Sequence, residues 1–347
     1  MKRKIIRSVM MFISVVFAFL FISEKDSVSA SLSSALSMCG DVLIPSLFPF
    51  MVLSSFSISC GLYDSDSRFV GFIMTKLFRL PPVCFSALIF GFSGGYPVGA
   101  RIVGELYEKG QIDDMQAKHL LSFCVNAGPA FSVAVAGGML TGSHTAGLII
   151  LLSVSLSSLI VGVVYGRFSK QINAEKCEFS VRCISVTESL VNAVNSAGNG
   201  ILSVCGWVLA FSAFSSIFRQ FIADEKLRLI YDSVAEVTSG LSSAAETGGM
   251  PMVAACVSFG GLCVMCQNMP QIKKCGMKIS EYLLFRIINS ILSFCVCRLL
   301  LQICDVTVTV FSSMEPAMHF APASAALLIM CAVLMCDVVK IRSPYLS

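Results

Sequence analysis

The stretch Gly91-Phe92-Ser93-Gly94-Gly95-Tyr96-Pro97-Val98-Gly99-Ala100-Arg101 ends an apolar run that begins at about Val83. Its glycines leave the backbone unconstrained and its proline removes an amide donor, so the helix breaks there. A run of about ten residues covers about 15 Å as a helix, roughly half the hydrocarbon thickness of a bilayer. We therefore expect a re-entrant half-helix led by Pro81-Pro82. Such breaks are tolerated at membrane depth where they line a cavity, and in transporters they commonly hold the substrate.

The composition places the whole chain in the membrane. Of its 347 residues, 56% are hydrophobic and 13% are charged, whereas a soluble domain carries roughly 25% charged residues. The apolar runs are long, unlike the short alternating segments of a transmembrane β-barrel. We therefore expect an all-α polytopic membrane protein. The net charge of +4 is spread over the loops and gives no nucleic-acid signal.

The sixteen cysteines lie mostly within apolar runs, where a free cysteine behaves as a small hydrophobic residue. Cys263 and Cys266 form a C-x-x-C pair, but no second pair or histidine pair has the spacing of a zinc site. Packing is the favoured interpretation, and we expect no metal or cofactor.

The chain divides into five segments by hydropathy and charge. Basic residues before the first apolar run, and Lys340 and Arg342 after the last, place both termini in the cytoplasm. We interpret the first run as a retained helix, although Val28-Ser29-Ala30 resembles a signal-peptidase site. The segments are an anchor helix with an amphipathic stretch (1–37), a first membrane repeat (38–166), a cytoplasmic linker (167–183), a second repeat (184–303) and a C-terminal loop, span and tail (304–347).

The first repeat contains a second break, Asn126-Ala127-Gly128-Pro129-Ala130. It follows a helix that Asp113 or Asp114 caps, and it precedes another short apolar run from Phe131 to Leu140. Two short runs and two breaks in one region indicate a site more strongly than either break alone.

The second repeat follows the first in outline, shifted by roughly 160 residues as internal repeats in transporters are. The span Gly200–Phe218 corresponds to Gly40–Phe56, and a short run led by Pro251 ends in Ser258-Phe259-Gly260-Gly261. We therefore expect two structural repeats, each with a Pro-led half-helix that ends in a Gly-rich break. Whether the repeats are parallel or inverted depends on the number of spans and stays open.

Several of these motifs together resemble a known family. The motifs resemble the sporulation integral membrane proteins of YlbJ type, in the nucleoside-recognition or Gate domain group. They are Ser93-Gly94-Gly95-Tyr96-Pro97-Val98-Gly99-Ala100-Arg101, Leu106-Tyr107-Glu108-Lys109-Gly110 and Leu121-Ser122-Phe123-Cys124-Val125-Asn126-Ala127-Gly128-Pro129. The resemblance extends over about residues 38 to 300. It implies an endospore-forming bacterium and a role in moving dipicolinate from the mother cell into the forespore, across the mother-cell-derived outer forespore membrane.

The candidate substrate-binding residues lie at the three breaks. Half-helix ends supply free N–H groups and partial charge, Tyr96 can stack on a ring, and Arg101 suits a carboxylate. Glu236 and Glu246 are candidates for ion coupling. The substrate-binding set is Ser93, Gly94, Gly95, Tyr96, Pro97, Gly99, Arg101, Asn126, Gly128, Pro129, Ser258, Gly260 and Gly261.

Each candidate also has a purely structural interpretation. The glycines would allow close helix packing in lipid, and Arg101 would pair with Glu105 one helical turn away. Asn126 would terminate a helix, and the two glutamates would be exposed loop carboxylates.

The favoured function is a membrane transporter of a small anionic solute, dipicolinate by the resemblance. The alternatives are a nucleoside or other metabolite transporter and a sporulation assembly factor that transports nothing. The chain has no G-x-x-x-x-G-K-[ST], H-E-x-x-H or G-x-S-x-G motif, so we expect no enzyme activity. The expected partners are the solute, the bilayer and a second copy of the chain.

Overall fold

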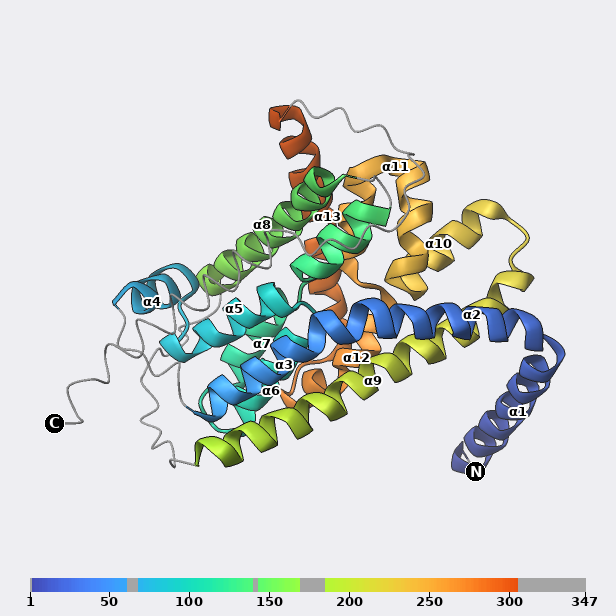
Figure 1. Ribbon diagram of the computed structural model, residues 1–347, viewed down its shortest axis with the longest axis horizontal. Helices are drawn as coiled ribbons and strands as arrows, with labels where there is room; N and C mark the ends of the chain where they lie inside the picture. Colours follow the sequence, from blue (N-terminus) through green and yellow to red (C-terminus); the bar gives the residue numbers. More distant parts are fainter. Residues whose placement is uncertain (1, 61–67, 140–142, 169–184, 305–347) are drawn as a thin grey trace.

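The computed structural model describes residues 2–60, 68–139, 143–168 and 185–304, and all of its regular elements are helical (Figure 1). Six described helices are long and apolar enough to cross a membrane, or seven if one bent pair counts as a span. The expected all-α polytopic membrane fold is therefore confirmed. The candidate spans are Lys4–Ser23, Lys25–Ser59, Thr145–Phe168, Val186–Phe221, Gly248–Lys274 and Ile279–Ile303.

The two longest helical stretches lie side by side. The first is α2 (Lys25–Met38), which continues through the π-helical turn η1 (Cys39–Leu43) into α3 (Ile44–Ser59). The second is α9 (Val186–Phe221). They run antiparallel, since the Gln220 amide at the end of α9 donates to Glu24 just before α2 (Figure 1).

This packing gives the amphipathic stretch a partner and corrects one expectation from the sequence. Val28 and Ala35 of that stretch pack against α9. The second long helix begins at Val186 and not at Gly200. α1 (Lys2–Ser23) contacts this pair through aromatic side chains, and Phe17 lies edge-on to Phe214 with ring centroids 5.1 Å apart.

The first half continues through short, broken helices. A helical segment up to Phe78 and the helix from Pro82 to Gly94 meet at an angle of 96°, so the Pro-led half-helix is present. Asp113 caps the helix after the hairpin in a capping box with Gln116, which confirms that expectation. The elements are α4 (Arg68–Phe72), η2 (Ile73–Phe78), η3 (Pro82–Cys84), α5 (Phe85–Gly94), α6 (Val98–Glu108), α7 (Asp114–Phe123), η4 (Ala130–Met139) and α8 (His144–Phe168).

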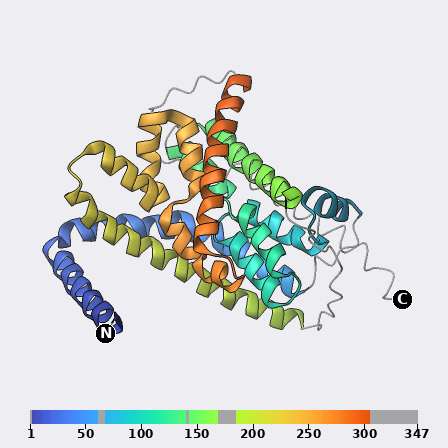
Figure 2. The same cartoon turned by 180° about the vertical axis from the view of Figure 1, so that it is seen from behind.

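The second half contains α10 (Glu225–Ala235), α11 (Val237–Phe259), α12 (Gly261–Lys274) and α13 (Ile279–Cys304). α11 is broken at Gly249, where φ is +61°, two residues before Pro251. The short helix that follows ends at Gly260, where φ is +81°. Both halves therefore contain a Pro-led short helix that ends at a left-handed glycine. Figure 2 shows α13 passing along this region, where it packs against α8 and α11.

At the centre of the molecule, α5, α6 and α7 lie between the long helices. Val98, Ala100, Leu121 and Phe123 are fully buried there. The expected last span, residues 323–339, and most of the expected linker lie outside the described residues.

Candidate functional site

The first two breaks lie directly against one another. At Gly95 φ is +77°, and a Cβ added there would lie 2.5 Å from the backbone nitrogen of Gly128. A Cβ at Gly91 or at Gly99 would lie within 2.3 Å of the Cys124 carbonyl oxygen. Glycine is therefore required at these positions because two pieces of backbone touch. This favours the packing interpretation for Gly91 and Gly99.

Tyr96 joins the first break to the break in the second half. Its hydroxyl donates a 2.8 Å hydrogen bond to the carbonyl of Val257, in the last turn of α11. A Cβ at Gly260 would lie 3.5 Å from the Tyr96 ring. The three breaks thus converge, although they are far apart in sequence.

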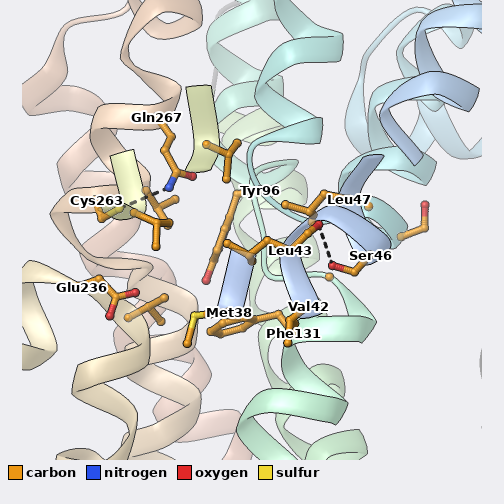
Figure 3. Close-up of a pocket in the computed structure, with 18 residues that line it drawn as sticks. Met38, Val42, Leu43, Ser46, Leu47, Tyr96, Phe131, Glu236, Cys263 and Gln267 are labelled. Carbon is orange, nitrogen blue, oxygen red and sulfur yellow. Dashed lines mark hydrogen bonds between the residues drawn. The ribbon is translucent and has the colours of Figure 1, made fainter. Parts of the chain in front are cut away.

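A cavity lies where the breaks meet, between the two halves of the chain. Its volume is about 60 Å³, which is enough for a few water molecules and smaller than the roughly 300–1,000 Å³ of small-molecule pockets. In Figure 3, Tyr96 stands between Leu43, Ser46 and Leu47 on one side and Glu236, Cys263 and Gln267 on the other. The remaining lining residues are Met38, Val42, Ser93, Gly94, Gly95, Gly128, Phe131, Val204, Val208, Val237 and Val264.

The lining is apolar except at a few points. Glu236, at the junction of α10 and α11, is buried and contributes a carboxylate. Gln267, on α12, contributes an amide whose nitrogen contacts the Cys263 sulfur at 3.4 Å. The lining set contains no lysine or arginine. The cavity lining therefore offers hydrogen-bonding groups and two aromatic rings, from Tyr96 and Phe131, but no lysine or arginine charge.

The predicted residues divide between the cavity and the packing behind it. Ser93, Gly94, Gly95, Tyr96, Gly128 and Glu236 line the cavity. The Ser93 hydroxyl donates to the Ile89 carbonyl of its own helix at 2.7 Å, so it is already engaged. Pro97, Gly99, Arg101, Asn126, Pro129, Ser258, Gly260 and Gly261 are not among the lining residues.

Arg101 lies away from the cavity, in contact with two long helices. Its Nε contacts the Glu105 carboxylate at 3.2 Å, as the ion-pair interpretation predicted. Its guanidinium also donates to Ser55 on α3, at 3.3 Å, and to Ser196 on α9. In this conformation, therefore, Arg101 ties α6 to the α3–α9 pair.

Asn126 and Ser258 belong to the polar packing around α13. The Asn126 amide donates to the Phe123 carbonyl at 2.6 Å, which terminates α7, and its oxygen accepts from Ser158 on α8 at 2.6 Å. The Ser258 hydroxyl is buried with no described hydrogen-bond partner. Glu246 is in α11, but its side chain lies outside the described residues.

Sequence reasoning missed two residues here. Gln267 gave no signal, because an amide near a helix end is ordinary. Arg286, on α13, is 2% exposed and donates to carbonyls at two of the breaks. The sequence could have indicated Arg286, since an ionisable residue inside the apolar span Leu283–Ile303 is a functional candidate by default. No group of three or more His, Cys, Asp or Glu in the described part of the chain is placed to hold a metal ion.

Fold and cavity together define a multi-pass helical membrane protein with broken helices around a space between its halves. Residues 41–171 match the Gate family, described as nucleoside recognition. The chain is also 29% identical, over 220 residues, to the sporulation integral membrane protein YlbJ of Bacillus subtilis (strain 168). That match covers 56% of this chain and 53% of the relative, so it spans about half the relative's length. The two matches confirm the predicted resemblance. No solved structure matches the chain.

Proposed function

We propose that this protein is a transporter that moves a small solute across a membrane through the cavity between its two halves. The observation that carries the proposal is the meeting of the breaks after Gly94, around Gly128 and at Gly260, next to a cavity lined from both halves. A scaffold gains nothing from irregular backbone at membrane depth, whereas transporters place their substrate there. Neither ATP hydrolysis nor other enzyme activity is part of the proposal.

We further infer that the two repeats are inverted with respect to one another. The antiparallel packing of α2–α3 with α9 supports this, because both long stretches precede a Pro-led short helix with a glycine break. Inverted repeats permit alternating access, in which one half rocks against the other around a fixed site.

The first candidate substrate is dipicolinate, moved into the forespore, with the protein in the outer forespore membrane and both termini in the mother-cell cytoplasm. The support is the similarity to a sporulation membrane protein and the resemblance on which the expectation rested. A dianion next to the Glu236 carboxylate is repelled, so removal of this charge should favour transport of dipicolinate.

The second candidate is a nucleoside or another neutral solute, which one observation favours. The lining residues hold no arginine or lysine, while Glu236, Gln267 and two aromatic rings match the polar edge and flat face of a base. The match to a family described as nucleoside recognition agrees with this candidate.

Uptake into liposomes tests the transport proposal. Purified protein should accumulate labelled dipicolinate or nucleoside, and Ser46→Trp, which fills the cavity, should reduce uptake at least tenfold. Ser34→Trp on exposed α2 surface is the matched control and should leave uptake unchanged. Uptake of neither solute, from correctly folded protein, would point to an assembly role. Equal uptake by the two tryptophan variants would exclude this cavity.

The variant Glu236→Gln distinguishes between the two candidate substrates. The substitution removes the carboxylate's charge and keeps its size, so the repulsion of a dianion is lost and dipicolinate uptake should rise. Nucleoside uptake should fall, because an anionic hydrogen-bond acceptor is lost. The same change in both uptake rates would contradict a direct role for Glu236 in substrate choice.

A further inference from the structure

Arg286 carries a buried positive charge, and the transport function proposed above gives this residue no role. It lies within the apolar helix α13 and is 2% exposed. No described carboxylate lies within ion-pair distance of it, since the described ion pairs of this chain involve other residues. Burying a charge costs free energy unless neighbouring groups hydrogen-bond to it. The groups around the Arg286 guanidinium therefore indicate its role.

The carbonyls at the end of α11 supply part of that compensation. A helix leaves its last four carbonyls without partners inside the helix. Here Gly260 N–H donates to the Cys256 carbonyl at 2.9 Å and the Tyr96 hydroxyl to that of Val257. The guanidinium of Arg286 donates to the remaining two carbonyls, those of Ser258 and Phe259. Arg286 therefore completes the end of the second-half short helix.

The break after α7 supplies the remaining hydrogen-bond acceptor of the guanidinium. Arg286 Nη1 donates to the Val125 carbonyl, just beyond the end of α7. One turn along α13, the Asn289 amide donates to the Ser122 carbonyl at 3.0 Å. A single guanidinium thus bridges the carboxyl ends of two short helices, one from each half of the chain.

The electrostatics of the arrangement are those of a cation site. The carboxyl end of a helix carries roughly −0.5 charge, so two such ends face one positive charge. In transporters with discontinuous helices, unwound carbonyls and half-helix carboxyl ends coordinate sodium ions. We propose that the carbonyls of Val125, Ser258 and Phe259 form a monovalent cation site that the guanidinium of Arg286 occupies as a tethered cation.

Two consequences follow. The site needs a positive charge more than it needs the shape of arginine, so an ammonium group should replace the guanidinium better than an uncharged chain does. When the side chain is removed, a small free cation should bind in its place. If the protein also transports, as proposed above, its uptake should not depend on sodium, because this site is already filled.

The first experiment compares Arg286→Lys with Arg286→Met by thermal unfolding in detergent. Both keep a long side chain, and only lysine keeps the charge. We expect the methionine variant to melt at least roughly 5 °C below the lysine variant. A methionine variant that equals or exceeds the lysine variant would overturn the proposal, because packing alone would then explain Arg286.

The second experiment titrates Arg286→Ala with methylguanidinium chloride in the low millimolar range. Its unfolding midpoint should rise with a saturable dependence, and choline chloride should have no effect. Arg298→Ala, on an exposed face of the same helix, is the matched control and should not respond. No saturable rise with methylguanidinium or sodium would overturn the cation site. These readouts do not involve uptake, so they stand apart from any failure of the transport proposal.

Discussion

At the scale of single residues, Gly95 shows how a motif that predicted a binding site also serves packing. It lines the cavity, and its φ of +77° and ψ of −173° belong to a region essentially confined to glycine. The backbone of Gly128 lies against the hydrogen that a side chain would replace. The same residue therefore shapes the cavity wall and allows two breaks to touch.

Gly95→Ala should lower the free energy of unfolding by about 2 kcal/mol or more, because the new methyl group combines backbone strain with a clash against backbone. Gly198→Ala is the matched control. A Cβ at Gly198 meets nothing within 4 Å, so alanine there should be neutral or stabilising by up to about 1 kcal/mol. Thermal unfolding of the two variants gives the comparison, and equal midpoints would contradict the close approach of the breaks.

At the scale of elements, α13 contributes a polar stripe within an otherwise apolar helix. Arg286, Asn289, Ser290 and Ser293 follow at helical spacing and face the neighbouring helices. Ser290 donates to the Ala255 carbonyl at 2.9 Å, and Ser293 shares a 2.6 Å hydrogen bond with Ser157 on α8. Within the stripe, Arg286 and Asn289 donate to carbonyls that the broken helices leave without partners, so α13 helps to make the breaks tolerable.

Asn289→Leu tests the stripe. The variant leaves the buried Ser122 carbonyl without this donor, and the Ser158 hydroxyl keeps only the Asn126 oxygen of its two acceptors. The expected cost is about 1–3 kcal/mol in the free energy of unfolding. Gln302→Leu makes the same chemical change at an exposed position of α13 and should be nearly neutral. If both variants unfold alike, the stripe has no special role in stability.

At the scale of the whole molecule, the two halves meet along the α2–α3 and α9 pair and again at the cavity. Cys39, from the first half, and Cys205, from the second, lie in thiol contact there. Their neighbours Met38 and Val204 line the cavity. A covalent link at this point would hold the halves together next to the proposed solute path.

Oxidation with copper phenanthroline should therefore join Cys39 to Cys205 and reduce uptake in liposomes, because alternating access requires the halves to move. Dithiothreitol should restore uptake. Cys39→Ser should be insensitive to the oxidant, and exposed Cys295 provides a control for oxidation elsewhere. Full uptake by protein shown to carry the Cys39–Cys205 bond would count against rocking of the halves.

The sequence alone was sufficient for the fold class and for the position of each break. Long apolar runs require helices that satisfy their own backbone, and Pro and Gly act on the few residues around them. The break after Gly94 and the Pro251-led helix that ends at Gly260 were therefore predictable. The packing of the segment before residue 38 was not predictable, because Val28 and Ala35 meet α9 only in the folded chain.

What only the tertiary structure decided is which breaks meet and which side chains they face. Tyr96 and Val257 are 161 residues apart in sequence, as are Arg286 and Val125, and no local pattern encodes such pairings. The structure turned Arg101 toward α3 and α9, brought Glu236 and Gln267 to the cavity, and placed Arg286 at the helix ends. Local backbone preferences act over a few residues, whereas burial and the pairing of polar groups depend on the packing of the whole chain.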